Sequence, residues 1–324
     1  MRPTSEQVKD ARELFRRLLL PTRLVRAERL GRDSDTAIYL KLETDLPTGS
    51  FKPRGALYAL MKNIEQRSAR SERPIKGVVA ASTGNHGAAV AYAAQLAKLP
   101  ATIFLPESPN PIKRARIVAL GATVEEVEWK PDALANAAAA FAEEHDYYFL
   151  NDASDELVPV GTATIAAEIF DKFTPDVIIV PMGDTALIRG VAAEAKHRHP
   201  SVRIVGVQAA QAPSYVRSWQ ADRVVTTDTC NTIADGLATC VPLESNVRAI
   251  RELVDEVTLV SEDELLQSIR TLLFEEHVVA EAAGAAATAA YLQNPGAYAG
   301  LSVVLLVTGS SIPHELLRQA ANLR

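Results

Sequence analysis

The sequence predicts an α/β fold with an open, mostly parallel sheet. Short strand-like runs alternate with helical patterns along almost all of the 324 residues, and this alternation is typical of right-handed βαβ units. The strand-like runs are continuously apolar, as expected for parallel strands that are covered on both faces. The length suits about two domains.

The expected strands are short and rich in β-branched residues, which favour strands. The first of them, residues 37–42 (AIYLKL), leads into a turn of small residues, and several others also end at turns. Ligands of open α/β sheets bind at such strand ends. The expected strands are residues 37–42, 77–80, 101–105, 123–127, 177–180, 203–207 and 302–307.

Helices are expected between and after these strands. The alanine-rich tracts 137–140 and 282–290 are interpreted as tightly packed helices, because alanine has the highest helix propensity. The expected helices are residues 53–67, 85–98, 110–120, 131–145, 155–171, 186–197, 261–275 and 281–293.

The composition limits the possible partners and locations. A formal net charge of −6 disfavours nucleic acid and anionic membranes as partners. No run approaches about 18 apolar residues, and residues 1–10 are charged without an apolar signal core. We therefore expect a cytoplasmic protein without a membrane segment.

The chain contains two cysteines, Cys230 and Cys240. Two are too few for a disulfide framework, and neither has metal-ligating neighbours. We expect both to be free thiols in or near the core.

The most informative segment is residues 48–55 (TGSFKPRG), which holds Lys52 in a small-residue turn between a strand and a helix. A lysine amine at a strand end suits covalent catalysis through a Schiff base. An isolated lysine in a loop is more often a solvated surface residue. A second motif at a strand-to-helix junction, residues 82–87 (STGNHG), favours the catalytic interpretation.

Three junctions supply further candidate ligand sites. Residues 82–87 precede a helix whose free N–H groups and dipole attract a carboxylate, although an ordinary Ser/Thr N-cap gives the same pattern. Residues 181–187 (PMGDTAL) could bind a phosphate on backbone amides, and residues 307–311 (VTGSS) end the last strand in hydroxyls or form a simple turn. Together with Lys52 these are the parts of a pyridoxal phosphate (PLP) pocket.

On these motifs the chain resembles the fold-type II PLP enzymes, the tryptophan synthase β-like class. Within that class it is similar to the serine/threonine dehydratase and serine racemase branch, from about residue 11 to the C-terminus. The lysine motif is highly specific, and His86 favours a dehydratase over a threonine or cysteine synthase. Weaker support comes from residues 160–162 (VGT), 233–237 (IADGL) and 281–284 (EAAG).

The resemblance implies two open, twisted, mostly parallel sheets flanked by helices, with PLP between two domains. Residues 1–52 and 151–324 would form the large PLP-binding domain, and residues 53–150 the small domain that closes on the substrate. The expected assembly is a homodimer that acts on a small amino acid.

The resemblance also implies roles for single residues. Lys52 would carry PLP and remove the substrate α-proton, and Phe51 would pack on the pyridine ring. Asn85 would hydrogen-bond the phenolic oxygen of PLP, and Thr308 would face the pyridine nitrogen. Other cofactor contacts would come from Gly183, Asp184, Thr185, Ala186, Leu187 and Gly236, and the substrate site from Ser82, Thr83, Asn85 and His86.

Two segments depart from the family pattern. Asp184, Thr185 and Ala186 replace glycines of the usual phosphate loop. A carboxylate aimed at phosphate would be repulsive, so we expect Asp184 to point away and Thr185 to donate its hydroxyl. Residues 208–214 (QAAQAPS), where many relatives bind a divalent cation, contain no carboxylate, so we expect no metal there.

The expected function is a PLP-dependent ammonia-lyase that eliminates water from a β-hydroxy amino acid, giving a 2-oxo acid and ammonia. The neutral Thr308 favours elimination over transamination. The alternatives are a racemase, a β-replacement or threonine synthase-like enzyme, and a PLP-binding partner subunit without turnover. Thr83 disfavours the racemase, because serine racemases keep a serine at that position. The substrate stays open among serine, threonine, a hydroxyaspartate, an aryl-serine and an intermediate of hydroxyectoine breakdown.

Overall fold

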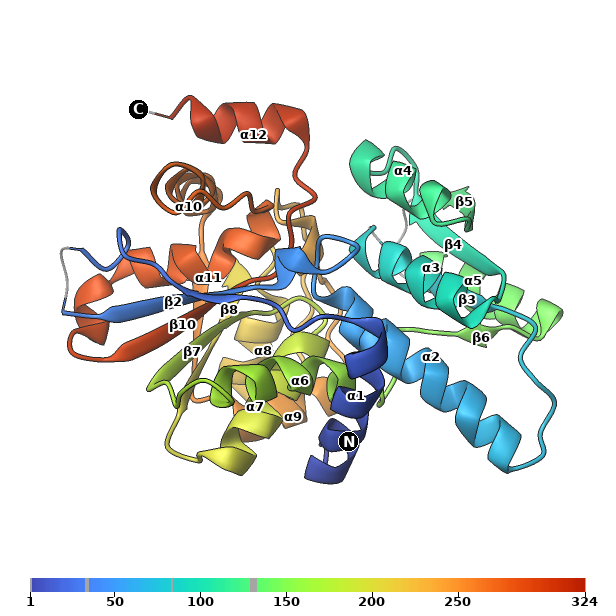
Figure 1. The fold of residues 1–324 in the computed structure, drawn as a ribbon. Helices are drawn as coiled ribbons and strands as arrows, with labels where there is room; N and C mark the ends of the chain where they lie inside the picture. Colours follow the sequence, from blue (N-terminus) through green and yellow to red (C-terminus); the bar gives the residue numbers. More distant parts are fainter. Residues whose placement is uncertain (1, 33–34, 83, 129–132, 324) are drawn as a thin grey trace.

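The computed structural model describes residues 2–32, 35–82, 84–128 and 133–323, which form two α/β units (Figure 1). The larger unit holds a six-stranded sheet in the order β1-β2-β10-β7-β8-β9. Among these described strands, the β1–β2 pair is antiparallel and the other pairs are parallel. The strands are β1 (Leu24–Arg26), β2 (Ala37–Leu42), β7 (Val177–Pro181), β8 (Arg203–Ala209), β9 (Glu256–Val260) and β10 (Ser302–Val307).

The smaller unit holds a four-stranded parallel sheet in the order β5-β4-β3-β6. Two mostly parallel sheets flanked by helices confirm the predicted fold class. The strands of this sheet are β3 (Val78–Ala81), β4 (Ala101–Pro106), β5 (Thr123–Val127) and β6 (Tyr148–Phe149).

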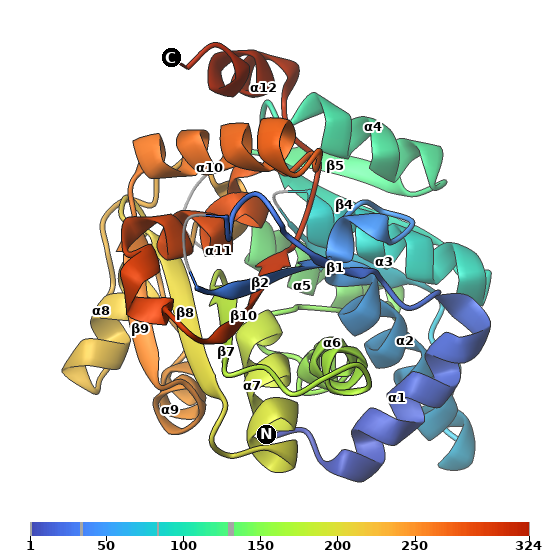
Figure 2. The same cartoon turned by 60° about the vertical axis from the view of Figure 1, so that its left-hand side comes forward.

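Helices cover both faces of each sheet (Figures 1 and 2). In the larger unit α10, α11 and α12 lie on one face, and α6, α7, α8 and α9 lie on the other. The helices are α1 (Ser5–Leu18), α2 (Lys52–Ala69), α3 (Asn85–Ala97), α4 (Pro111–Ala119), α5 (Ala133–His145), α6 (Val158–Phe170), α7 (Ala186–Arg198), α8 (Ser214–Ala221), α9 (Glu244–Leu253), α10 (Glu262–Glu275), α11 (Ala282–Gln293) and α12 (His314–Ala321).

The continuous apolar strands are explained by this two-sided cover. Val303 and Leu305 of β10 pack in the core beneath α11, whereas Val304 and Leu306 pack in the core beneath α7. Because successive side chains of a strand point to opposite faces, both sets must be apolar.

Several elements were not predicted from the sequence. β1 and β6 have three and two residues, too few for a recognisable pattern, and β9 is a mostly half-exposed edge strand. Helix α1 is highly charged, but a capping box between Thr4 and Gln7 starts it and an apolar stripe of Val8, Ala11 and Phe15 buries it. Helices α8, α9 and α12 were also missed.

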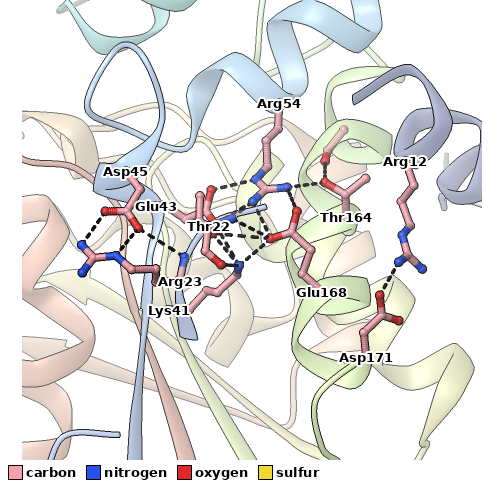
Figure 3. A network of polar contacts seen from close by, with 11 residues as sticks. Arg12, Thr22, Arg23, Lys41, Glu43, Asp45, Arg54, Thr164, Glu168 and Asp171 are labelled. Carbon is pink, nitrogen blue, oxygen red and sulfur yellow. Dashed lines mark hydrogen bonds and ion pairs between the residues drawn. The ribbon is translucent and has the colours of Figure 1, made fainter. Parts of the chain in front are cut away.

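Helix α2 is fixed to the larger unit by a buried ion network, shown in Figure 3. Arg54 is 1% exposed, and its Nε lies 2.8 Å from Glu43 Oε2 while its Nη1 lies 2.6 Å from Glu168 Oε1. Lys41 Nζ lies 2.5 Å from Glu168 Oε2. Glu43 follows β2 and Glu168 belongs to α6, so the network joins three elements at the start of α2.

Helices α2 and α6 also touch through their backbones. A Cβ atom on Gly161 of α6 would lie 2.1 Å from the carbonyl oxygen of Arg54, so only glycine fits there. This contact explains the glycine of the Val160–Gly161–Thr162 sequence that supported the family resemblance.

The expectation of two free, near-core thiols is wrong. Cys230 and Cys240 are half-buried and form a disulfide with a Cα–Cα distance of 5.5 Å, a normal spacing for such a bond. The loop between the two cysteines contains the 3-10 helix η2 (Asp235–Leu237). The backbone N–H of Thr227 donates to the carbonyl oxygen of Cys240, which brings the two ends of the loop together. The path of this loop could not be read from the spacing of the cysteines.

The Arg54 network gives a stability prediction. Arg54→Met should lower the free energy of unfolding by about 3–5 kcal/mol, because it leaves Glu43 and Glu168 buried with too few cationic partners. The matched control is Arg23→Met, which removes the exposed Arg23–Asp45 ion pair and should cost at most about 1 kcal/mol. Denaturant unfolding measures both losses, and equal losses would contradict the assigned role of the network.

The disulfide gives a second prediction. Replacing both Cys230 and Cys240 by serine should lower the free energy of unfolding by about 2–3 kcal/mol, because the bond closes a loop of this length in the unfolded chain. A reductant should destabilise the parent protein by a similar amount and leave the double variant unchanged. Detection of two reactive thiols in unreduced, folded protein would refute the pairing.

Candidate active site

A cavity of about 290 Å³ lies where the two units meet. Its lining residues follow the carboxyl ends of β3 (Ser82), β6 (Asp152), β7 (Gly183) and β10 (Thr308). Strand ends from both sheets therefore converge on one cavity, which is the usual position of a ligand in open α/β sheets.

Most of the residues predicted to form the site line this cavity. The exceptions are Ala186, which contributes its backbone N–H beside the cavity, and Thr83, which lies outside the described residues. The predicted residues that line the cavity are Phe51, Lys52, Ser82, Asn85, His86, Gly183, Asp184, Thr185, Leu187, Gly236 and Thr308.

The Lys52 amine lies between two carboxylates. Its Nζ is 2.5 Å from Asp152 Oδ2 and 3.1 Å from Asp184 Oδ2, and it lies 5.1 Å from the centre of the Phe51 ring. Burial lowers the pKa of the Lys52 amine, but the charges of Asp152 and Asp184 and their hydrogen bonds outweigh burial and raise it above its usual value. The amine is therefore an ammonium group in this arrangement.

Asp152 was missed by the sequence analysis. It follows β6, whose two residues gave no strand signal, although an Asn–Asp pair after an apolar run is a usable hint of a strand end. Burial raises the pKa of the Asp152 carboxyl, but the nearby charges of His86 and Lys52 outweigh burial and lower it. Asp152 is thus an ionised partner of the lysine.

The expectation that Asp184 points away from the ligand site is wrong in this structure. Its side chain lines the cavity, with Oδ2 near Lys52 and Oδ1 accepting the Ala186 N–H at 3.1 Å. The Lys52 ammonium group and a backbone N–H in the first turn of α7 both attract a carboxylate. These two attractions explain the orientation.

Thr185 has the features of a phosphate-binding residue. It starts α7 in the left-handed region with φ 74°, which is rare for a β-branched residue. Thr185 lines the cavity, and its Oγ1 is buried without a hydrogen-bond partner among the described residues, a costly condition unless a ligand completes the bond. A Cβ on the preceding Gly183 would lie 2.4 Å from the Gly236 carbonyl oxygen, so the loop packs closely on η2.

The side chains of the motif at the start of α3 make contacts within the motif and with other segments of the chain. Ser82 Oγ accepts the N–H groups of Gly84 and Gly87 at 2.8 and 3.0 Å, as an N-cap side chain does. Asn85 Nδ2 donates to Glu281 Oε1 at 2.5 Å. His86 Nε2 lies 2.9 Å from the Leu150 carbonyl oxygen and its Nδ1 lies 3.5 Å from Asp152 Oδ2.

Lys113 of α4 joins the two units beside the cavity. Its Nζ lies 2.7 Å from Asp235 Oδ1 and 3.1 Å from Glu281 Oε2, and its side chain is 2% exposed. Burial lowers the pKa of the Lys113 amine, but the charges of Glu281 and Asp235 outweigh burial and raise it. The ammonium group is therefore retained, and it links α4 to η2 and to the start of α11.

The structure adds two observations on metals and membranes. In the described part of the chain, no group of three His, Cys, Asp or Glu side chains could hold a metal ion. Gln208, at the start of the segment 208–214, accepts the Val216 N–H at 3.0 Å. None of the helices formed by the described residues is long and apolar enough to span a bilayer.

Together these residues fit PLP, the cofactor expected from the sequence. Lys52 would supply the amine, the buried Thr185 hydroxyl and the start of α7 would supply donors for a phosphate, and Thr308 would supply a hydroxyl at the end of β10. The Asp184 carboxylate, in contrast, would oppose a phosphate. The fold and the site therefore define a protein of the PLP-dependent class.

Comparisons with known proteins agree. Residues 16–309 match the family described as pyridoxal-phosphate dependent enzyme. The chain belongs to this family, which confirms the predicted family and cofactor.

Individual relatives are similar over most of the chain. The L-threonine ammonia-lyase of Geobacter sulfurreducens is 35% identical over 307 residues, which cover 94% of this chain and 75% of the relative. Maize serine racemase superposes with a TM-score of 0.91 at 25% identity, covering 99% of this chain and 97% of that chain. The processed form of threonine deaminase isoform 2 from Solanum lycopersicum superposes with a TM-score of 0.87 at 27% identity, covering 99% of this chain and 95% of that chain.

The buried Thr185 hydroxyl gives a prediction about cofactor affinity. Thr185→Ala should weaken PLP binding by about 1.5–3 kcal/mol, the scale of a hydrogen bond to a charged group. The cofactor-free variant should be no less stable than the parent, because the hydroxyl has no partner in the protein. Thr185→Ser keeps the hydroxyl and serves as the control.

Absorbance titration with PLP measures these affinities, and thermal unfolding compares the cofactor-free proteins. Parent-like PLP affinity in Thr185→Ala would place the phosphate elsewhere.

Proposed function

We propose that this protein is a PLP-dependent ammonia-lyase that removes water from a β-hydroxy amino acid of the serine or threonine kind and yields a 2-oxo acid and ammonia. The observation that carries the proposal is the position of the Lys52 amine, in a cavity at converging strand ends and beside the start of α7. Relatives that are named as L-threonine ammonia-lyases and threonine deaminases support the same reaction.

PLP, when bound, supplies an electron sink for charge that develops at the substrate α-carbon. Lys52 is the proposed base for the α-proton, since it is the amine that faces the cavity. Asp152 favours its ammonium form, so it stabilises Lys52 after it has accepted the proton. Asp152 also lies near His86, which places a second titratable group beside the base.

Thr308 supports elimination over transamination. Its hydroxyl lies 3.4 Å from the Ala283 carbonyl oxygen and is buried at the end of β10. A neutral hydroxyl cannot hold a protonated pyridine nitrogen as a carboxylate would, and this weakens the electron sink. We propose that Thr308 faces that nitrogen and that Phe51 packs on the ring.

The proposed substrate-binding residues are Ser82, Asn85 and His86, around the start of α3, together with Thr83. Residues 53–150 are proposed to act as the small domain that closes on the substrate, with residues 1–52 and 151–324 as the large domain. All four strands of the smaller sheet lie within 53–150, and Lys113 and Asn85 bridge from this segment to Glu281. Closure would exclude water from the cavity.

We further propose a cytoplasmic homodimer. The formal net charge of −6, which disfavours anionic membranes as partners, supports a location in the cytoplasm. Light scattering of the purified protein tests the assembly.

Racemisation is the second candidate, because the maize serine racemase is a near structural neighbour. The two reactions differ in their products from a single enantiomer. Release of 2-oxo acid and ammonia without formation of the other enantiomer supports the lyase, whereas accumulation of the other enantiomer supports a racemase.

The catalytic assignment of Lys52 gives a prediction. Lys52→Ala should lose turnover by several orders of magnitude, because it removes both the covalent anchor and the base. Lys62→Ala is the control, since Lys62 lies on the same helix and pairs with Asp10 and Glu65. It should keep parental activity.

Borohydride reduction followed by peptide mapping identifies the modified residue. A pyridoxyl group on Lys52 is the expected result. Label on another lysine of the PLP-saturated protein would overturn the assignment. In a separate assay, ammonia release from a panel of β-hydroxy amino acids ranks the substrates.

A further inference from the structure

The Asp184 carboxylate lies at the start of α7, beside the hydrogen-bond donors that a phosphate would use. Its Oδ1 accepts the Ala186 N–H in the first turn of α7, and its Oδ2 lies 3.1 Å from Lys52 Nζ. A helix start is a favourable anion site, and here a carboxylate of the chain already binds there. The neighbouring Thr185 hydroxyl, 1% exposed and without a partner, marks the same place as a site for a further acceptor.

The groups around Asp184 come from three helices and one loop. Lys52 faces it from α2 and Asp152 from the loop after β6, while Arg189 of α7 and Tyr215 of α8 interact with its charge. Among these described residues, Lys52 makes the cationic hydrogen bond to the carboxylate. Arg189 Nη2 instead donates to the Ala153 carbonyl oxygen at 3.1 Å.

Binding of PLP changes this charge balance in two ways. A phosphate monoester brings close to two negative charges near pH 7. Lys52 loses two of its three N–H donors when its nitrogen condenses with an aldehyde, whose oxygen leaves as water. It can then no longer donate to both Asp152 and Asp184, so one carboxylate loses its cationic partner beside the incoming phosphate.

We propose that Asp184 takes up a proton when PLP binds, and that its neutral carboxyl group then donates a hydrogen bond to the cofactor phosphate. The inference rests on PLP as the cofactor of the proposed function. Asp152 keeps His86 at 3.5 Å, whereas Asp184 keeps the neutral Ala186 N–H and its side-chain hydrogen bond with Asp152, a second carboxyl group. Burial and the charge of Asp152 raise the pKa of the Asp184 carboxyl, which agrees with this choice of residue.

A protonated carboxylic acid is a hydrogen-bond donor, so the departure from glycine would add a phosphate contact. Because the bound form holds one more proton than the free form, PLP affinity must fall as the pH rises. The fall approaches about tenfold per pH unit where Asp184 is ionised in the free protein. Titration of PLP itself contributes equally to every variant and cancels in a comparison.

The test compares the parent, Asp184→Asn and Asp184→Gly. Each holoenzyme is stripped of PLP, and rebinding is followed by visible absorbance from about pH 6.5 to 9 in buffers without phosphate. Asparagine supplies a donor that does not titrate, so Asp184→Asn should bind PLP tightly with a pH slope smaller by about one unit than the parent slope. Asp184→Gly should share the small slope and bind more weakly than Asp184→Asn.

Calorimetry in buffers of different ionisation enthalpy counts the protons directly, and the parent should take up about one more proton per PLP than Asp184→Asn. Equal pH slopes and equal proton uptake in the two proteins would overturn the proposal. Tighter binding by Asp184→Gly than by Asp184→Asn would also overturn it, because the side chain would then contribute no donor.

None of these readouts requires turnover, so the lyase and the proton linkage can fail separately. A parent protein with the extra pH dependence that releases no ammonia from any β-hydroxy amino acid would refute the lyase and leave the role of Asp184 standing. If the parent releases ammonia but its PLP affinity depends on pH no more than that of Asp184→Asn, the lyase stands and the proposed role of Asp184 is refuted.

Discussion

The buried ion network around Arg54 determines where Lys52 lies. Arg54 is two residues beyond Lys52, in the first turn of α2, and its guanidinium binds Glu43 after β2 and Glu168 in α6. Buried charges are tolerated only with well-placed partners, so α2 cannot slide along its axis without leaving charges unpaired. The backbone contact with Gly161 restricts sideways movement as well. The start of α2, and with it Lys52, is thereby held in register with the ends of the large sheet.

The same electrostatic arrangement occurs twice, once in the cavity and once beside it. Lys52 lies between Asp152 and Asp184, and Lys113 lies between Asp235 and Glu281. In each case one ammonium is shared by two carboxylates from different segments. The Lys113 group can stay intact, since it joins the two units structurally, but the Lys52 group must be rearranged by any chemistry at its amine. The Lys113 ion pairs can therefore persist during a reaction, whereas the Lys52 ion pairs must change.

The sequence predicted most strands of both sheets because buried parallel strands are apolar on both faces, and it located the cavity because ligand motifs follow those strands. It could not locate Asp152, whose strand is only two residues long. The orientation of Asp184 depends on an ammonium 132 residues away in the chain, and no local pattern encodes such a contact. The left-handed conformation of Thr185 was equally hidden, because a β-branched residue does not normally indicate a positive φ.

The Cys230–Cys240 disulfide encloses the segment that carries Asp235, Gly236 and Leu237 to the cavity wall. One covalent bond outside the cavity therefore shapes part of its lining. Thiol reagents and the redox history of a preparation become structural variables for this protein. Samples purified with and without reductant are chemically different molecules, and data from them should be compared only after their thiol content has been measured.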